Sequence, residues 1–368
     1  MRASIITFQE SSNNGALLQA YALQTVLTDL TGEKCDIINY HSAHKAKDYK
    51  NHNKKEILVY LNRLLSKRIR NTMDKKAAVF KDTFLNITGK VYYCLDDLKE
   101  LNSEYDNFVC GSDQVWNPNN TGGDEAFLLS FVADDSKLIS YAPSIALSKI
   151  PDEFKEIYKR NILRFTHLSV REKSGKNIIK DLTNKDAKVV LDPTLLLDSH
   201  RWNTILQSIE TKEPYIFVYC ITHRPQLIEY AKKLRKHTGL PIVMAIHTVR
   251  DVYICRKNGF RGMIVSPQEF VGAIANAEHV ITNSFHATVF SVNYQVNMSI
   301  FGNKGRMKDA NNRMKDILTQ LHLGDRFIDD SSEYNILTDD VQNFDEVIAS
   351  LHTMRKESMD FLGSALSL

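Results

Sequence analysis

Two side chains with useful chemistry, Arg171 and His286, each lie within four positions after a short apolar run. Arg171 follows residues 167–170, and His286 ends the segment Asn283-Ser284-Phe285-His286, which comes after residues 280–282. If both runs are buried parallel strands, both side chains lie at the carboxyl ends of strands, where open α/β sheets bind ligands. An imidazole can donate a proton, and a guanidinium can bind a carboxylate or phosphate through two hydrogen bonds. These residues are the first candidates for a catalytic acid and an anion-binding group.

Both candidates also have an ordinary structural interpretation. His286 lies at a predicted helix start, where the helix dipole lowers the pKa of a histidine unless an anion is bound. A histidine in that place can equally be a satisfied structural residue, and Arg171 can equally pair with a nearby acid. Under the functional interpretation, we expect His286→Ala and Arg171→Ala each to abolish turnover while leaving a folded protein.

Three further loops place polar or small residues after predicted strands. A glycine between a strand and a helix lets backbone N–H groups approach an anion, and Asp113 is a candidate for orienting or deprotonating a hydroxyl. The same loops can instead be an Asn-Gly turn, a helix cap beside a packed Trp116, and a plain turn after residue 140. Lys304 and Arg313 are either phosphate contacts or solvated basic residues. The candidate substrate-binding residues are Asn14, Gly15, Gln19, Gly111, Ser112, Gln114, Trp116, Tyr141, Ser144, Asn283, Ser284, Phe285, Lys304 and Arg313.

Several well-known site patterns do not occur in the sequence. There is no HExxH and no close cluster of His, Asp and Glu, so no metal is predicted. There is no GxSxG, no GxxxxGK[ST] and no GxGxxG, which argues against a hydrolase elbow, a P-loop and a dinucleotide cofactor. The five cysteines are scattered without a CxxC pair, which argues against a zinc cluster or a disulfide scaffold and favours a reducing compartment.

The composition is that of an ordinary globular chain, with 43% hydrophobic and 25% charged residues over 368 positions. The net charge of +3 does not indicate a nucleic-acid partner. No run of apolar residues is long enough for a membrane span or a signal peptide, so we expect a cytoplasmic protein. Residues 45–76 stand out, because they hold eleven Lys and Arg against three Asp and Glu.

Short apolar runs alternate with helix-period stretches along the chain, which predicts parallel sheets covered by helices. This pattern occurs twice, so we predict two Rossmann-like α/β domains, residues 1–195 and 196–340. The basic, helix-prone residues 45–84 are predicted to be a helical insertion in the first domain. Residues 341–368 are predicted to form a final helix that packs back on the first domain.

Six of these segments, in this order, resemble the polysaccharide pyruvyl transferase family. They are residues 14–24, Gly111-Ser112-Asp113-Gln114-Val115-Trp116-Asn117, Ser140-Tyr141-Ala142-Pro143-Ser144, Ser169-Val170-Arg171-Glu172, Asp192-Pro193-Thr194-Leu195-Leu196 and Thr282-Asn283-Ser284-Phe285-His286. One departure is Ala287, where many members have glycine. The basic stretch 45–76 matches no motif of the family.

The resemblance implies a fold like that of the two-domain GT-B glycosyltransferases, with the site in the interdomain cleft. It implies phosphoenolpyruvate as the donor substrate, with no separate cofactor, and a sugar as the acceptor. The product would be a pyruvate ketal, often across O4 and O6 of a hexose, in capsular, exopolysaccharide or cell-envelope biosynthesis. By the same resemblance, His286 is the general acid and Arg171 holds the anionic donor.

Two other functions remain open from the sequence. One is a GT-B-type glycosyltransferase that uses a nucleotide sugar, and the other is a non-catalytic protein that binds a saccharide or nucleotide. The acceptor can be free or linked to a lipid diphosphate. The basic residues 45–76 are either a peripheral contact with the anionic inner face of the membrane or a solvated helical surface.

Overall fold

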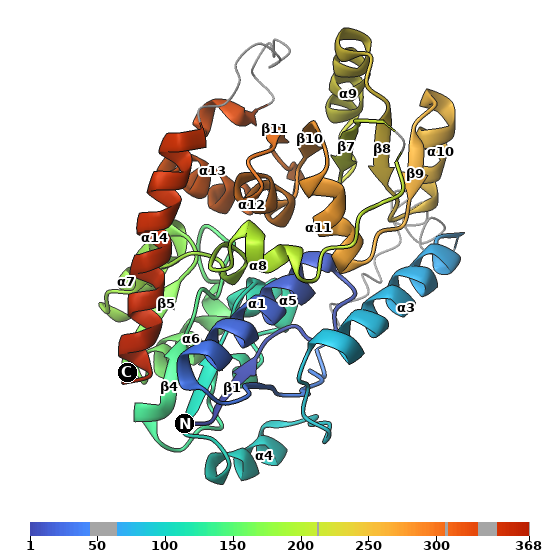
Figure 1. Ribbon diagram of the computed structural model, residues 1–368. Coiled ribbons are helices and arrows are strands. Elements are labelled where there is room, and N and C mark those ends of the chain that lie inside the picture. The colour runs from blue at the N-terminus through green and yellow to red at the C-terminus, as the bar shows by residue number, and fades with distance from the viewer. Residues whose placement is uncertain (45–64, 212, 306–307, 330–343, 368) are drawn as a thin grey trace. The chain divides into compact units, whose positions relative to one another are not determined.

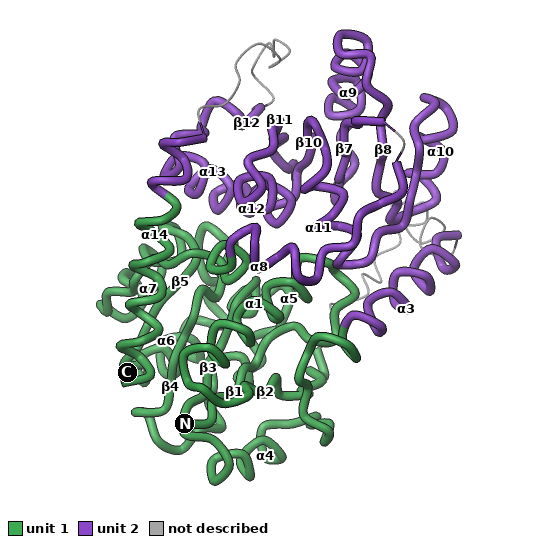
Figure 2. The backbone as a smooth tube through the Cα atoms, viewed as in Figure 1, with its two compact units in different colours: residues 1–48, 81–197, 351–368 green, residues 49–80, 198–350 purple. Residues whose placement is uncertain are grey.

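The computed structural model describes residues 1–44, 65–211, 213–305, 308–329 and 344–367 (Figure 1). The chain divides into two compact units (Figure 2). Unit 1 comprises residues 1–48, 81–197 and 351–368, and unit 2 comprises residues 49–80 and 198–350. Each unit is built on a parallel sheet of six strands.

The sheet of unit 1 has the order β2-β1-β3-β4-β5-β6, with every pair parallel. The central strands are apolar runs buried on both faces, as parallel strands covered by helices require. Ile6 of β1 is level with Cys110 of β3, and Cys110 is level with Ser140 of β4. Their loops therefore leave the sheet at one edge. The strands are β1 (Ala3–Ile6), β2 (Asp36–Ile37), β3 (Asn107–Cys110), β4 (Leu138–Ser140), β5 (His167–Val170) and β6 (Lys188–Val189).

The helices of unit 1 have identifiable starts and stops. The first begins at an Asn13 cap and ends at Gly32, whose φ of 71° suits glycine. The last helix docks on unit 1, where Arg355 donates to Leu195 O and Ser358 accepts from Leu191 N–H. The α-helices are α1 (Asn14–Thr31), α4 (Leu95–Leu98), α5 (Pro118–Thr121), α6 (Asp152–Ile162), α7 (Lys173–Thr183) and α14 (Phe344–Ala365), the last from residue 351 on. The 3-10 turns are η1 (Lys99–Ser103), η2 (Gln114–Trp116), η3 (Glu125–Leu128), η4 (Asp135–Lys137) and η5 (Pro193–Leu195).

Unit 2 has the strand order β12-β11-β10-β7-β8-β9, which is the order of a Rossmann sheet. Its strands are β7 (Ile216–Tyr219), β8 (Ile242–Ala245), β9 (Arg261–Met263), β10 (His279–Thr282), β11 (Asn297–Phe301) and β12 (Phe327–Ile328). Its helices are α8 (Ser199–Asn203), α9 (Pro225–Thr238), α10 (Val249–Asn258), α11 (Pro267–Ala275), α12 (Phe285–Asn293) and α13 (Asn311–Gln320), with the 3-10 turn η7 (Gly324–Arg326).

The predicted basic insertion lies partly outside the described residues. Its described part contains helix α3 (Lys67–Phe84). We predicted the insertion in the first domain, whereas residues 65–80 group with unit 2. Two contacts explain the grouping, since Lys76 Nζ lies 2.7 Å from Glu269 Oε2 and Val249 N–H donates to Ser66 Oγ at 3.0 Å.

A buried histidine makes unit 2 sensitive to acid. His279 begins β10, and its Nε2 lies 2.8 Å from Ser299 Oγ. Burial, assisted by Arg326, lowers the pKa of His279 to about 4. Between pH 6.5 and 4 the unfolded chain therefore binds a proton that the folded chain does not, so stability falls as the pH falls, by up to about 3 kcal/mol for this group. We expect His279→Gln to reduce the loss of stability between pH 7 and 4.5 in urea unfolding followed by circular dichroism. An unchanged pH dependence would assign the effect to other groups.

Candidate functional site

Each sheet reverses its strand order once, and ligands bind beyond the carboxyl ends of strands at such a switch point. In unit 1 the switch lies between β1 and β3, and in unit 2 it lies between β7 and β10. The loops after these strands therefore form one candidate site in each unit, at the carboxyl end of its sheet. We call these sites the unit 1 edge and the unit 2 edge. They carry most of the residues that we predicted from the sequence.

The loop after β3 is fixed by buried polar side chains. Ser112 N–H donates to Gln19 Oε1 at 2.9 Å, and Gln19 Nε2 donates to Thr7 Oγ1 at 2.9 Å. Ser112 Oγ donates to Ala142 O at 2.8 Å. Ser112, Gln19 and Thr7 are fully buried, and these hydrogen bonds join the loops after β1, β3 and β4 to one another. This corrects the prediction that Gln19 and Ser112 contact substrate, and it adds Thr7, which the sequence analysis missed.

The backbone donors that we predicted for an anion in unit 1 are occupied. The Asn13 side chain caps α1 and accepts from Gly15 N–H at 2.9 Å. Gly111 N–H donates to Ile6 O at 3.1 Å, and Asn14 is a buried first residue of the helix. A Cβ at Gly111 would clash with the carbonyl of the β4 loop, so this glycine serves close packing. The predicted roles of Gly15 and Gly111 as anion donors are corrected accordingly.

Asp113 is the residue of this loop that best fits a functional role. Its backbone φ of 64° and ψ of −166° lie in a region that residues other than glycine rarely adopt. Such conformations persist where surrounding contacts enforce them, and they concentrate at functional sites. Here Ser144 N–H donates to Asp113 O at 2.7 Å. The carboxylate is 14% exposed, so it can accept a hydrogen bond from a sugar hydroxyl.

Arg171 lies in a buried ion cluster. Its Nη1 is 2.6 Å from Asp192 Oδ2, its Nη2 is 3.4 Å from Asp113 Oδ1, and its Nε is 3.9 Å from Glu172 Oε2. Burial alone lowers the pKa of Arg171, but the three carboxylates outweigh it and hold that pKa above its ordinary value. Since three carboxylates surround one guanidinium, the cluster is negative when ionised. An anionic donor is disfavoured there, which revises the predicted role of Arg171 as an anion clamp.

Two predicted substrate-binding aromatic residues belong to the core of unit 1. Trp116 is fully buried, and its Nε1 donates to Phe127 O at 2.9 Å. Tyr141 is fully buried, and its hydroxyl donates to Leu191 O at 3.0 Å. Both side chains satisfy their polar atom internally, as buried Trp and Tyr usually do. Their predicted contact with substrate is therefore corrected to packing.

The other two candidates of unit 1 differ in exposure. Ser144 is fully buried and donates to Glu172 Oε1 at 3.1 Å, so its role is internal. Gln114 is partly exposed next to Asp113, and its Oε1 accepts from Asn117 Nδ2 at 2.9 Å. Gln114 thus remains a candidate for contact with an acceptor.

In unit 2, His286 is the second residue of α12, and α12 begins two residues after the end of the switch-point strand β10. Ser284 caps this helix by accepting from Ala287 N–H at 3.4 Å. His286 is 8% exposed, and its ring packs edge-on against Phe285 with centroids 5.4 Å apart. The guanidinium of Arg313 lies over the Phe285 ring at 5.3 Å. An imidazole at the positive end of a helix, with a guanidinium on the adjacent ring, favours a bound anion.

Asn283 fixes the turn that precedes His286. Its Oδ1 accepts from Ile221 N–H at 2.8 Å, and its Nδ2 donates to Thr222 O and Oγ1 at 2.7 Å. Thr222 Oγ1 in turn donates to Asn303 Oδ1 at 2.5 Å, and Asn303 Nδ2 donates to Asn283 O at 3.0 Å. Asn283 therefore connects the loops after β7, β10 and β11, and it is fully buried. Like Ser284, it shapes the site rather than reaching into solvent.

Sequence reasoning missed three residues of this edge, Thr222, Arg224 and Asn303. Arg224 is 4% exposed and donates through Nη1 to Gly302 O. Lys304, which we predicted, follows Asn303 and is exposed. The signal that could have found the missed residues was present, because each lies within five positions after a strand.

The two edges differ in charge. The unit 1 edge carries the carboxylate cluster, whereas the unit 2 edge carries His286, Arg224, Arg313 and Lys304. An anion is thus favoured at unit 2, and a neutral hydroxyl-bearing group is favoured beside Asp113. Across the described residues, no group of three or more His, Cys, Asp or Glu has the geometry to hold a metal ion.

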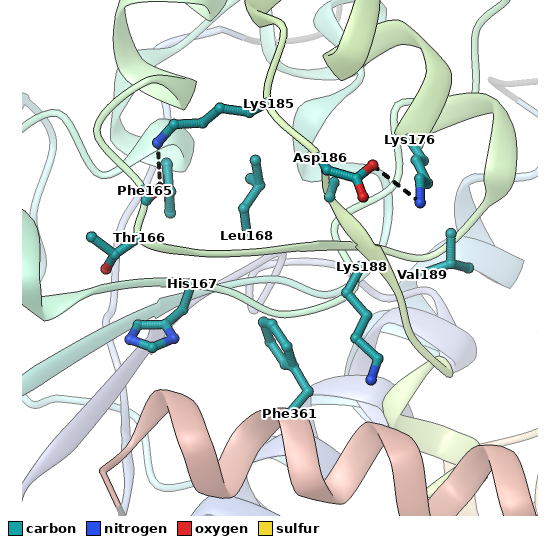
Figure 3. Close-up of a pocket in the computed structure, with 11 residues that line it drawn as sticks. Phe165, Thr166, His167, Leu168, Lys176, Lys185, Asp186, Lys188, Val189 and Phe361 are labelled. Carbon is teal, nitrogen blue, oxygen red and sulfur yellow. Dashed lines mark hydrogen bonds and ion pairs between the residues drawn. The ribbon is translucent and has the colours of Figure 1, made fainter.

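An open pocket of about 710 Å³ lies elsewhere on unit 1 (Figure 3). Most of its lining residues lie just before β5 and β6 or within these strands, and Lys176 of α7 and Phe361 of α14 complete it. Figure 3 shows Phe361 of α14 between His167 and Lys188. The pocket contains none of the predicted site residues, and we do not assign the reaction to it.

The chain is similar to known proteins in sequence and in structure. The sequence model of the polysaccharide pyruvyl transferase family matches residues 13–305. No match was found among curated proteins. The UDP-GlcNAc 2-epimerase from Methanocaldococcus jannaschii is similar in structure, with a TM-score of 0.53, 14% identity and coverage of 96% of this chain and 93% of that one. The S. aureus MnaA–UDP structure has a TM-score of 0.50, 10% identity and coverage of 97% and 90%.

The fold and the strand-end sites define an α/β protein of two Rossmann-like units, and the predicted GT-B-like fold class is confirmed. The chain belongs to the polysaccharide pyruvyl transferase family, because the family match covers most of its length. Among the described helices, none combines the length and the apolar character needed to cross a membrane.

Proposed function

We propose that the protein transfers pyruvate from phosphoenolpyruvate to two hydroxyls of a sugar as a ketal and releases phosphate. The observation that carries the proposal is the setting of His286 at the start of α12, after the switch-point strand, with Arg313 on the neighbouring ring. The membership of the chain in a pyruvyl transferase family supports the reaction class. The donor is a substrate, and the proposal requires no cofactor.

The first step of the proposed reaction is proton transfer to the donor. The carboxylate and phosphate of phosphoenolpyruvate favour the imidazolium form of His286, as a nearby anion stabilises any cation. The imidazolium gives its proton to the methylene carbon, which becomes a methyl group, and C2 becomes oxocarbenium-like. Arg224, Arg313 and Lys304 are the cations of unit 2 that we propose to bind the donor's negative charge.

The second step joins the acceptor to C2. A sugar hydroxyl adds to C2, and its proton passes to the Asp113 carboxylate, which we propose as the general base. The bond between C2 and the phosphate oxygen then breaks, and the electron pair leaves with phosphate. The second hydroxyl adds to the same carbon and gives its proton to the released phosphate, which closes the ketal ring. Arg171 orients Asp113 in this scheme and does not touch the donor.

The function is tested by phosphate release from phosphoenolpyruvate with a panel of acceptors. The panel contains free and lipid-diphosphate-linked galactosides and mannosamine derivatives. We expect acceptor-dependent phosphate release and an acceptor mass increase of about 70 Da, the pyruvyl unit less water. Stabilisation by a UDP-sugar together with no response to phosphoenolpyruvate would replace this proposal by a nucleotide-sugar glycosyltransferase. Binding of a saccharide with no turnover of either donor would indicate a non-catalytic binding protein.

We also propose that the protein acts in the cytoplasm, where phosphoenolpyruvate is available, on capsular, exopolysaccharide or cell-envelope saccharides. In unit 2, α3 presents Lys67, Arg68 and Lys75 to solvent, while Lys76 is held by Glu269. Each basic residue near an anionic membrane contributes about 1 kcal/mol of attraction. The exposed face of α3 is therefore a candidate for peripheral contact with the inner membrane surface.

This contact predicts binding to vesicles that contain anionic lipid. We expect the protein to float with such vesicles at low salt and to be released at high salt, because exposed charges are screened. Replacing Lys67, Arg68 and Lys75 with glutamate is expected to abolish flotation. The matched control reverses three exposed charges on α9 and α10, namely Lys236, Arg256 and Lys257. Equal flotation of neutral and anionic vesicles, or equal loss in the control, would contradict a contact made by α3.

A further inference from the structure

Glu172, the residue after Arg171, has a role that its position beside the ion cluster does not explain. Its side chain is buried, and its Oε1 accepts three hydrogen bonds, from Ser144 Oγ at 3.1 Å, Ile145 N–H at 3.0 Å and Ala146 N–H at 3.1 Å. Its other oxygen is 3.9 Å from Arg171 Nε. The closest contacts of Glu172 are therefore with the loop after β4 rather than with the guanidinium.

The loop held by Glu172 has an unusual backbone. Ala142 has a φ of 51° and Ala146 has a φ of 50°, in the left-handed region that side chains with a Cβ avoid. Two such residues within five positions need outside support to persist. Glu172 supplies it at one end of the loop through Ile145 and Ala146, and Ser112 Oγ supplies it at the other end through Ala142 O.

The same loop holds the backbone of Asp113. Ser144 donates its N–H to Asp113 O at 2.7 Å, and Pro143 forms a parallel bridge with Asp113. Arg171 N–H donates to Pro143 O at 3.3 Å, so residues 143–144 are hydrogen-bonded both to Asp113 and to the residue after β5. A continuous set of contacts therefore runs from the Glu172 carboxylate through Ser144 to the strained Asp113.

We infer that Glu172 is a positioning residue, which fixes the β4 loop and thereby holds the Asp113 carboxylate in its reactive orientation. This inference rests on the proposed function for its effect on turnover. A misplacement of a reacting group by about 1 Å can lower the rate about 10²-fold. Because Glu172 does not touch the donor, its removal should change kcat and leave KM for phosphoenolpyruvate nearly unchanged.

The test compares Glu172→Ala and Glu172→Gln in wild-type and Asp113→Asn backgrounds. We expect Glu172→Ala to lower kcat about 10²-fold. Glu172→Gln should lower kcat less than Glu172→Ala does, because the amide oxygen of glutamine can still accept hydrogen bonds from the β4 loop. In the Asp113→Asn background neither variant should lower kcat further. The control is Asp36→Asn, a half-buried carboxylate of β2 bound by Arg2 and Tyr105, which should leave kcat unchanged. Equal losses in both backgrounds would overturn the inference.

A second measurement decides the inference without relying on activity. Amide hydrogen exchange is compared in peptides that cover residues 111–117 and 141–146. If Glu172 positions Asp113, Glu172→Ala and Glu172→Gln raise exchange in both peptides, in that order of size, and Asp36→Asn in neither. Faster exchange confined to residues 141–146 would overturn the inference. If the wild-type protein releases no phosphate from phosphoenolpyruvate, the proposed function fails, and the exchange result alone decides the role of Glu172.

Discussion

His286→Ala is expected to lower phosphate release from phosphoenolpyruvate by about 10²–10⁴-fold, the range for loss of a general acid. The imidazole is the titratable group at the start of α12, and it is the proton donor of the proposed first step. Because the substitution removes the proton donor of the chemical step, kcat should fall by a larger factor than KM rises. The measurement is a coupled phosphate assay that can still detect a rate about 10⁴-fold below that of the wild-type protein.

Two controls separate chemistry from folding in this experiment. His286 is buried within α12, so alanine leaves a cavity, whereas His286→Gln retains most of the volume and has no acid of comparable pKa. We expect His286→Gln to be as inactive as His286→Ala while unfolding near the wild-type temperature. His237→Ala, at an exposed histidine near the end of α9, should leave turnover unchanged. Phosphate release at the wild-type rate by His286→Gln would remove His286 as the acid.

Arg171→Ala is expected to destabilise the protein by about 3–5 kcal/mol, the usual cost of breaking a buried ion pair by removing one partner. Asp192 and Glu172 are buried, and the variant would leave their carboxylates together without the guanidinium between them. This expectation differs from the one drawn from the sequence, which was an inactive but folded protein. Urea unfolding at neutral pH gives the free energy directly.

The variant Arg171→Met/Asp192→Asn provides the matched control for that result. It removes the cation and the carboxylate closest to it, so less uncompensated charge remains, and we expect part of the stability to return. Arg160→Ala, at an exposed arginine paired with Glu125, should cost at most about 1 kcal/mol. If Arg171→Ala unfolds at the same urea concentration as the wild-type protein, the buried cluster does not hold unit 1 together.

The sequence was sufficient for the main architecture because apolar runs report burial directly. The apolar runs at residues 167–170 and 280–282, which we predicted to be buried parallel strands, lie in β5 and β10, and the boundary between the units falls after Leu197. The assignment of residues 65–80 to unit 2 depends on partners that lie far away in the sequence, such as Glu269.

The sequence also determined which side chains follow the strand ends, among them Asp113, Arg171 and His286. Only the tertiary structure decided which of these side chains are available. Arg171 is bound to Asp192 and Asp113, which are 21 and 58 positions away, and Trp116 and Tyr141 point into the core. The physical reason is that strand position follows from local hydrophobicity, whereas hydrogen bonds and ion pairs depend on which distant segments the fold brings together.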